Sequence, residues 1–405
     1  MKKVLSFLLI FILFIAKTSA LELEISSKNA ILYNLDNGEI LYEKNADEKA
    51  SIASLTKIMT ALVALENIDN LDEQVIITKD DFEGLIEANA VTAGFTVGEV
   101  VTYRDLLYGL LLPSGADAAK ALARNIAGSE EAFIEKMNTK AAKLHLKSTH
   151  FSTVIGLDDT ANFSTAKEVA TIFKEALKNE EFKTIITTQK YTSSDGKIEL
   201  NSTIQSNAKK FNIEIPYVLG GKTGTTTDAG LCLATIAEAE DVNYMLITLG
   251  ATYDKKSPHN IEDAKIIYDY FIENYGNQLV VNKEKSFIEI KTKYTDKETL
   301  KLYPTKNITL YLKNDYNKNG VKYIYNGKGE ITPFNKKGEK LGTLNIYYQD
   351  KLLDTQEIIL KENLKFNFLS FVKEEFIKII IAIVGLIVII ISIVIIKKKL
   401  TKKAG

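Results

Sequence analysis

The chain has 405 residues, of which 46% are apolar and 25% are charged, and its formal net charge is −1. This length allows two or more domains, and this composition is that of a globular protein and excludes a mostly disordered one. The balanced charge argues against a nucleic-acid-binding protein, which normally carries a basic excess. The one cysteine, Cys232, excludes an intramolecular disulfide, and its place in an alternating segment predicts a small core residue.

Residues 1–20 have the pattern of a secretory signal peptide. Two lysines precede an apolar run over residues 4–16, and small residues at 18–20 provide a cleavage point. A retained N-terminal anchor is the alternative, but the apolar run is short for a membrane span. We therefore predict that residues 1–20 are removed.

Residues 21–276 are predicted to form one α+β domain. Apolar periodicity and the Asn37-Gly38 hairpin signal predict strands over 30–33, 40–42, 231–236 and 244–249 and helices over 103–112, 116–126, 131–144, 165–177 and 264–275. A further helix is predicted to begin at Ser54, and Thr165 with Glu168 has the pattern of a capping box. Strands at both ends with helices between them predict an antiparallel sheet covered by a helical cluster.

Beyond residue 277 the composition changes and helical spacing disappears. Short alternating segments between Asn- and Gly-rich turns predict a small all-β domain over residues 277–364, with strands over 287–290, 308–312, 321–325, 344–348 and 357–360. A spacer that holds the first domain away from a membrane is favoured over a binding module, because this region has no cluster of chemically distinctive residues.

The C-terminal end predicts attachment to a membrane. Residues 365–375 mix lysines with phenylalanines, as in an amphipathic segment at a membrane interface, and residues 376–396 form an almost uncharged apolar run. The part from Ile379 to Ile396 rises about 27 Å as a helix, near the hydrocarbon thickness of about 30 Å. A buried core helix is the alternative, but the run has no polar face. The lysines of residues 397–405 predict a cytoplasmic tail, so we expect a single-pass protein whose catalytic domain lies outside the cell membrane.

Ser54 and Lys57 are the candidate catalytic pair. The same Ser-x-x-Lys spacing also begins at Ser164, Ser194, Ser206 and Ser370. Only Ser54 opens an apolar-periodic helix, on which its hydroxyl and the Lys57 ammonium share one face beside free N–H groups that can stabilise an oxyanion. Lys57 can act as a base only when neutral, so we expect burial and a second cation, with Lys222 as the candidate, to lower its pKa.

Lys222-Thr223-Gly224 occurs once, between segments that alternate like strands. A lysine and a hydroxyl can bind a carboxylate, and a glycine lets a peptide approach the strand closely. Ser-x-x-Lys and Lys-Thr-Gly are two of the three motifs of penicillin-binding enzymes. The two motifs together therefore indicate a serine acyl-transfer enzyme.

The residues around these motifs resemble those of a known family, the D-alanyl-D-alanine carboxypeptidases, or low-molecular-weight penicillin-binding proteins. The similar stretches are Ala53–Ala61, Asp105–Gly115, Gly221–Thr225 and Ala229–Leu233. The resemblance covers residues 24–275. It implies the β-lactamase/transpeptidase-like fold, followed by a small β domain and a C-terminal membrane attachment.

The resemblance also implies a role for each motif residue. Ser54 would be the nucleophile, Lys57 its general base, and Ser114 a relay of the proton to the leaving amine. Lys222 and Thr223, followed by Gly224, would bind the terminal carboxylate of the substrate. The backbone N–H groups of Ser54 and Thr225 would form the oxyanion hole.

Two departures from the family pattern stand out. The middle motif of the family is Ser-x-Asn, but here Ala116 follows Ser114-Gly115, so the amide that would bind the substrate is missing and slow turnover is expected. Many relatives carry an arginine for the carboxylate where this chain has residues 257–260. Lys255, Lys256 or His259 could replace it, and the sequence leaves the three open.

We therefore predict a membrane-anchored serine carboxypeptidase that removes the terminal D-alanine from peptidoglycan stem pentapeptides and is trapped covalently by β-lactams. No cofactor and no metal are predicted, since His145, His150 and His259 lack metal-ligand spacing. A β-lactamase is one alternative, although no glutamate-centred deacylation motif is recognisable between Ser114 and Lys222. A non-catalytic penicillin- or peptidoglycan-binding protein is the other.

Overall fold

The computed structural model describes residues 21–401, so the predicted signal peptide lies outside the described residues. The chain divides into two compact units between Asn274 and Tyr275.

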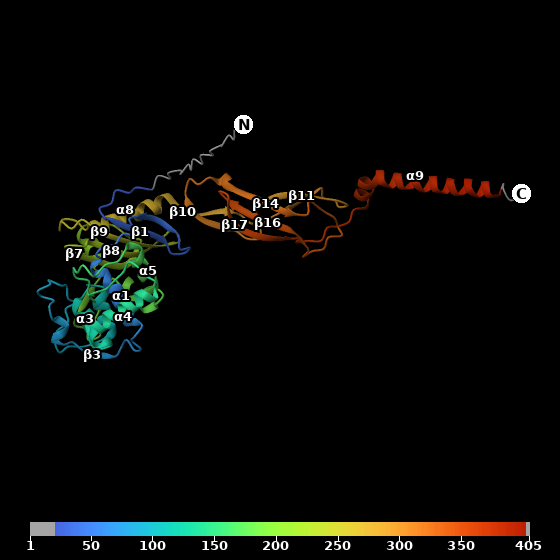
Figure 1. Ribbon diagram of the computed structural model, residues 1–405. Coiled ribbons are helices and arrows are strands. Elements are labelled where there is room, and N and C mark those ends of the chain that lie inside the picture. Colours follow the sequence, from blue (N-terminus) through green and yellow to red (C-terminus); the bar gives the residue numbers. More distant parts are fainter. Residues whose placement is uncertain (1–20, 402–405) are drawn as a thin grey trace, which may run out of the picture. The chain divides into compact units, whose positions relative to one another are not determined.

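The first unit is built on a five-stranded antiparallel sheet (Figure 1). Its strands are β1 (Asn29–Asn34), β2 (Ile40–Lys44), β7 (Val218–Thr226), β8 (Gly230–Ala239) and β9 (Val242–Ala251). β1 and β2 form the predicted hairpin, and β1 then pairs with β9, which comes more than 200 residues later. The order β2-β1-β9-β8-β7 leaves β7 at one edge of the sheet.

Helices cover both faces of this sheet (Figure 1). α8 (His259–Asn274) packs on β8 and β9 from one side, and α5 (Ala166–Ala176) packs on β1 and β9 from the other. α1 (Thr56–Leu65) lies in the middle of the helical cluster and is buried from Thr56 to Ala64, because other helices surround it on all sides.

The remaining helices and short strands of the first unit surround α1 or connect to it. They are β3 (Gln74–Ile76), η2 (Lys79–Phe82), β4 (Val100–Thr102), α2 (Tyr103–Leu111), α3 (Ala116–Ala127), α4 (Glu130–Lys143), α6 (Glu180–Thr187), β5 (Lys190–Thr192), β6 (Glu199–Asn201) and α7 (Thr203–Lys210). The α+β class predicted from the sequence is confirmed.

Three local predictions differ from the structure. The helix expected to begin at Ser54 starts with a 3-10 turn, η1 (Ala53–Leu55), before α1. The Thr165 side chain accepts from the Glu168 N–H as predicted, but the Glu168 carboxylate accepts from Lys147 and Ser148 instead of completing the box. α8 begins five residues before the predicted 264, because polar residues of its first turn conceal the helical spacing.

The second unit is an all-β domain followed by one helix. Its strands are β10 (Tyr275–Val281), β11 (Ile288–Thr292), β12 (Thr299–Leu302), β13 (Ile308–Lys313), β14 (Val321–Gly327), β15 (Glu330–Ile331), β16 (Lys340–Tyr348) and β17 (Lys351–Ile359), with a short η3 (Lys318–Gly320). β14, β16 and β17 form an antiparallel sheet, and β11 lies between β12 and β15. An apolar core that includes Leu344, Ile346 and Ile358 joins these small sheets. The predicted β domain is confirmed.

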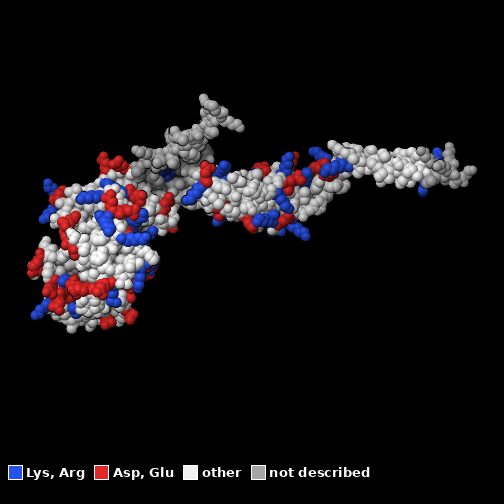
Figure 2. Space-filling model, viewed as in Figure 1, with Lys and Arg blue, Asp and Glu red and all other residues white. Residues whose placement is uncertain are grey.

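α9 (Phe368–Thr401) is a single helix that contains the predicted apolar run. Its stretch from Phe368 to Lys398 is long and apolar enough to cross a membrane, and the most apolar window has a mean hydropathy of 3.7. None of that window is buried against the protein. Figure 2 shows most of the helix as an uncharged surface, in contrast to the mixed charges on the β domain.

Candidate active site

Ser54 and Lys57 are brought together at the start of α1. The Lys57 Nζ lies 3.0 Å from the Ser54 Oγ, which is within the distance needed for direct proton transfer. Ala53, just before the serine, has a φ of 46°, a left-handed conformation that is strained for a residue with a Cβ. Strain of this kind is common at catalytic residues, and here it accompanies the sharp entry of the chain into η1.

The other four Ser-x-x-Lys matches do not form such a pair. Their serine hydroxyls bond elsewhere: Ser164 with Thr149, Ser194 with Asp105, Ser206 with the Ser202 carbonyl, and Ser370 with Glu374. The sequence context that singled out Ser54 thus agrees with the side-chain geometry.

Lys57 is buried, and burial lowers its pKa from 10.5 to about 7. The negative charge of Asp117 opposes this shift by raising the pKa. The Nζ also donates to the Ile155 carbonyl at 2.7 Å, which directs the remaining lone pair of a neutral amine toward Ser54. Near neutral pH a substantial fraction of Lys57 is therefore neutral, and its amine lies where a general base for Ser54 would lie.

The segment that supplies the Ile155 carbonyl packs unusually closely on the nucleophile. A Cβ on Gly156 would lie 2.1 Å from the Ala53 carbonyl oxygen, and Gly156 has a φ of +77°. Thr60 in α1 donates to the Val154 carbonyl at 2.8 Å. Only glycine fits at position 156, so this residue allows Lys57 to reach the Ile155 carbonyl.

β7 brings the Lys-Thr-Gly motif to the nucleophile. A Cβ on Gly224 would lie 3.1 Å from the Ser54 nitrogen, so the absence of a side chain lets the edge strand lie against η1. The close approach that Gly224 permits is therefore to the backbone of Ser54. Thr225 follows it and lines the cleft beside Ser54.

Lys222 lies beneath the cleft rather than in its wall. It is fully buried, and its Nζ donates to the Thr223 carbonyl at 2.8 Å. Burial, followed by the positive charge of Lys57, holds the pKa of Lys222 well below its usual value. The Thr223 hydroxyl lies 2.7 Å from the Thr203 hydroxyl. Of the two motif residues predicted to hold a carboxylate, only Thr223 lines the cleft.

Ser114 lies between α2 and α3 and faces the cleft with a φ of 74°. Ala116 also lines the cleft, so its methyl group stands where the family motif would place an amide. Asp117 is buried, and its Oδ1 accepts from the Ala93 N–H at 2.7 Å. Burial raises the pKa of Asp117, while N–H groups of residues 93–95 lower it. Asp117 thereby attaches the 88–95 segment, which forms one wall of the cleft, to the start of α3.

The cleft has two parts that share Ser54, Ser114 and Thr225. The Asp158 part has a volume of about 450 Å³ and is lined also by Lys57, Ala116, residues 155–158 and Thr226. The Lys255 part has a volume of about 520 Å³ and is lined also by Thr203, Lys210, Thr223 and Lys255. The Asp158 part contains one carboxylate besides the amine of Lys57, whereas the Lys255 part contains the ammonium groups of Lys210 and Lys255 and no carboxylate, so the Lys255 part is the more positive.

The structure separates the three candidates for the missing arginine. Lys255 lines the cleft, whereas Lys256 and His259 are absent from both linings. The His259 Nδ1 lies 2.7 Å from Glu262 and its Nε2 lies 3.4 Å from Asp254, so both ring nitrogens face carboxylates. Lys255 is therefore the candidate that can reach a ligand.

Several site residues carried no signal in the sequence. Asn89, Ile155 and Asp158 come from loops, and only the tertiary structure brings them to the cleft. Cys232 is buried as predicted, and burial raises its pKa to about 12. Among residues 21–401, no group of three His, Cys, Asp or Glu side chains could hold a metal ion.

Comparison with known proteins agrees with this site. Residues 16–253 match the family described as D-alanyl-D-alanine carboxypeptidase, and residues 275–365 match the C-terminal domain of penicillin-binding protein 5. The chain is 32% identical to the D-alanyl-D-alanine carboxypeptidase DacF of Bacillus subtilis, over 87% of this chain and 90% of that protein. It is 29% identical to the carboxypeptidase DacC of Escherichia coli, over 83% of each protein.

Solved structures share the fold. The DD-transpeptidase of Streptomyces K15 aligns with a TM-score of 0.56 and 33% identity over 62% of this chain and 98% of that one. Penicillin-binding protein 5 of Haemophilus influenzae aligns with a TM-score of 0.60 and 24% identity over 85% of this chain and 99% of that one. The transpeptidase-like fold with a C-terminal β domain is therefore confirmed. The chain belongs to the D-alanyl-D-alanine carboxypeptidase family of serine peptidases.

Proposed function

We propose that this enzyme removes the terminal D-alanine from peptidoglycan stem pentapeptides through an acyl-enzyme on Ser54. The observation that carries the proposal is the 3.0 Å contact between the Ser54 hydroxyl and the buried amine of Lys57. A neutral Lys57 takes the hydroxyl proton while the Ser54 oxygen attacks the carbonyl between the two D-alanines.

The resulting oxyanion is bound by the N–H groups of Ser54 and Thr225. The close packing of β7 on η1 at Gly224 supports this pairing, because it brings the two backbone segments together at the cleft. When the intermediate collapses, the peptide bond breaks and the proton on Lys57 passes through Ser114 to the leaving amine. Water then attacks the Ser54 ester, and the hydroxyl recovers its proton as the shortened peptide leaves.

The charges in the cleft orient the peptide. Its terminal carboxylate lies in the Lys255 part, near Thr223 and Lys210, and the preceding residues extend toward the Asp158 part. β7 is an edge strand, so its free side can pair with the extended backbone of the substrate. Lys222 is fully buried and donates to the Thr223 carbonyl, so it supports the carboxylate site by holding the strand that carries Thr223.

β-Lactams acylate the same serine because they present a reactive amide and a carboxylate to the same groups. With Ala116 in place of the motif asparagine, one hydrogen bond to the substrate is absent from the middle motif. Removal of a single transition-state donor costs about 10²- to 10³-fold in other serine enzymes. We therefore expect slow turnover unless another amide replaces it.

Membrane anchoring through α9 gives the enzyme its location. The apolar length of the helix and its lack of contact with the protein support a single span. The lysines of residues 397–403 favour a cytoplasmic C-terminus, so the catalytic unit lies outside the membrane together with its substrate.

Mass spectrometry of the full chain in detergent, after incubation with benzylpenicillin, tests the proposal. We expect one covalent adduct on the parent and none on Ser54→Ala. Ser206→Ala is the matched control from another Ser-x-x-Lys match and should keep the adduct. Release of D-alanine from a pentapeptide by the parent then separates catalysis from binding. An adduct on Ser54→Ala, or a parent that binds penicillin but releases no D-alanine, contradicts the proposal.

A further inference from the structure

We propose that the second unit carries a membrane-docking surface, formed by Phe334 and the segment Phe366–Leu369, which seats the β domain on the lipid bilayer beside α9. The inference builds on the proposed membrane anchoring. It adds a second contact, made by a loop of the β domain more than 30 residues before the helix.

The docking surface is apolar and exposed. Phe334 is 73% exposed, Phe366 50%, Phe368 65% and Leu369 79%. Exposed side chains of this size, gathered on one small domain, indicate a surface that is covered in use. Phenylalanine is well suited to insert at the boundary between lipid headgroups and acyl chains.

A row of rings connects the Phe334 loop to the helix. The ring centroids of Phe334 and Phe366 are 6.4 Å apart, and those of Phe366 and Phe371 are 5.8 Å apart. Phe371, in the first turn of α9, then packs edge-on against Tyr294 at 5.0 Å. The docking surface is thus continuous with the apolar helix that we place in the membrane.

Hydrogen bonds attach the start of α9 to the β domain. The Asn367 N–H donates to the Tyr294 carbonyl at 2.7 Å, and the Tyr294 hydroxyl donates to Glu375 at 2.6 Å. The Tyr294 N–H donates to Glu374 at 3.2 Å. Because these bonds and the ring contacts act together, the Phe334 loop stays close to the point where α9 begins.

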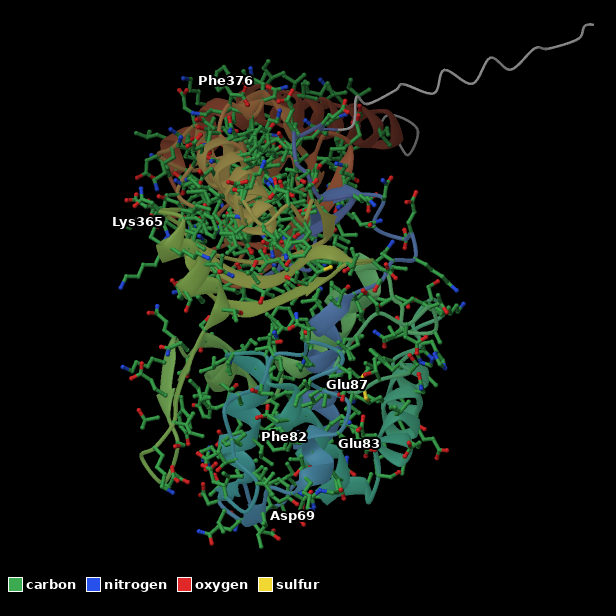
Figure 3. All side chains as sticks on the ribbon, turned by 90° about the vertical axis from the view of Figure 1, so that its left-hand side faces the viewer. Asp69, Phe82, Glu83, Glu87, Lys365 and Phe376 are labelled. Atoms are coloured by element: carbon green, nitrogen blue, oxygen red, sulfur yellow. The ribbon has the colours of Figure 1, made fainter. Side chains whose placement is uncertain are left out.

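The charges around the surface favour a bilayer as the occupant. The nearby Glu339, Glu362 and Glu375 each pair with a lysine, and Glu374 accepts from the Tyr294 N–H and the Ser370 hydroxyl. Within residues 21–401, the exposed Lys336, Lys337, Lys365 and Lys373 form no ion pair, so their ammonium groups can meet lipid phosphates. Lys365 and Phe376, on either side of the helix start, lie at the outside of the unit (Figure 3).

A fluorescent label at position 334 tests the docking surface in the full chain. Cys232 is buried with a raised pKa, so a cysteine introduced at the surface is the one that reacts. Phe334→Cys is labelled with an environment-sensitive dye and reconstituted into phosphatidylcholine–phosphatidylglycerol vesicles. Lys318→Cys is the matched control. Lys318 lies in η3, next to the end of β16 that is farther from the Phe334 loop, and β16 is about 27 Å long.

We expect the dye at 334 to emit at shorter wavelength in vesicles and to be quenched by spin-labelled lipid, whereas the dye at 318 is quenched by aqueous iodide. Equal accessibility of both positions to iodide, in protein that floats with the vesicles, overturns the docking surface alone. Protein that fails to float with the vesicles overturns the membrane anchoring itself.

A different observation carries a second inference, which rests on the proposed role of Ser54. The geometry points to Asn89 as the amide that binds the substrate in place of the asparagine missing at position 116. Asn89 lines both parts of the cleft, together with Ser54 and Ser114. Within residues 21–401 its side-chain amide makes no hydrogen bond, so it is available to a ligand.

The Asn89 segment is attached directly to the position of the missing amide. The Ala116 N–H donates to the Val91 carbonyl at 2.8 Å, and Asp117 holds the Ala93 N–H at 2.7 Å. Asn89 itself has a φ of 48°, a left-handed conformation that asparagine adopts more readily than most residues. The loop therefore brings the Asn89 amide into the same cleft lining as the methyl group of Ala116.

The rate of acylation by benzylpenicillin tests this role. Asn89→Gly removes the amide but tolerates the positive φ, and we expect it to lower the second-order acylation rate about tenfold or more. Adding Ala116→Asn to Asn89→Gly should restore most of that rate. Asn45→Gly, at a similar φ of 46°, is the control and should leave the rate unchanged.

Two results would overturn the role of Asn89. One is an acylation rate of Asn89→Gly within twofold of the parent. The other is that Ala116→Asn changes the acylation rate by the same factor in the parent as in Asn89→Gly. In either case the adduct on Ser54 still forms, so the proposed nucleophile is judged separately.

Discussion

The two units differ in where they place ionisable side chains. Among its described residues, the catalytic unit buries six lysine and aspartate side chains, namely Lys57, Asp81, Asp105, Asp117, Lys222 and Asp263. In the described part of the second unit, the buried polar side chains are Thr292, Thr295 and Gln356, all uncharged. Its lysines and carboxylates instead form exposed pairs such as Lys301–Glu289.

This difference shows what each unit is built to do. Burial of an amine destabilises its charged form, so the catalytic unit gives up stability to keep Lys57 neutral beside Ser54. The second unit does not carry this cost, and its apolar core of Leu344, Ile346 and neighbouring residues is an ordinary β-domain core. We infer that its function depends on its surface and not on buried charge.

Removing the buried base should have the largest effect. Lys57→Gln should lower acylation by about 10²- to 10⁴-fold. In the parent, the acylation rate should rise as the pH increases through about 7, where Lys57 loses its proton, and then level off. Lys167→Gln, from the Ser164 match, should change neither the rate nor the profile, because the Lys167 amine pairs with Asp47 and not with a serine. A parent rate that falls through the same pH range would show that the charged amine is the active form.

A cavity in the second unit should cost stability without affecting catalysis. Leu344 is fully buried, so Leu344→Ala should destabilise the β domain by about 2–5 kcal/mol in thermal unfolding. Leu352→Ala is the control, because Leu352 is 50% exposed, and it should have little effect. D-alanine release at 25 °C should stay the same in both variants. A large loss of activity in Leu344→Ala would show that the two units are coupled.

Removing a cleft lysine should have a moderate effect. Lys255→Ala should raise the KM for a pentapeptide about three- to tenfold, with little change in kcat, because an exposed charge contributes less than a buried one. Lys256→Ala is the control and should have the same KM and kcat as the parent. For a pentapeptide with an amidated C-terminus, the KM of Lys255→Ala should equal that of the parent. A higher KM of the variant for this peptide would show that Lys255 does not act on the carboxylate.

The exposed pairs of the second unit should have the smallest effect. Lys340 and Glu357 face each other across β16 and β17, with 53% and 67% of their side chains exposed. Lys340→Ala should change the free energy of unfolding by about 0–1 kcal/mol, as is usual for surface pairs. Chemical denaturation measures this change. A loss comparable to that of Leu344→Ala would contradict the contrast between the two units.

Much of the fold and of the candidate site follows from local patterns. The Ser54–Lys57 pair depends on the geometry of a single helical turn, and the Lys222–Gly224 motif depends on a single strand. The strand β15 was not predicted, because two residues are too few to show an alternating pattern. The role of Glu168 was only half predicted, since its carboxylate binds a loop that local spacing does not place nearby.

The sequence by itself determined the α+β class, the β domain, the apolar helix and the pairing of Ser54 with Lys57, which we propose as nucleophile and base. Only the tertiary structure decided that Ile155 holds Lys57, that Lys255 rather than Lys256 reaches the cleft, and that Asn89 lines the cleft together with Ala116. The physical reason is that spacing along a helix or strand fixes which neighbouring side chains share a face. Burial, and with it the pKa of Lys57, depends on segments about 100 residues away in the chain.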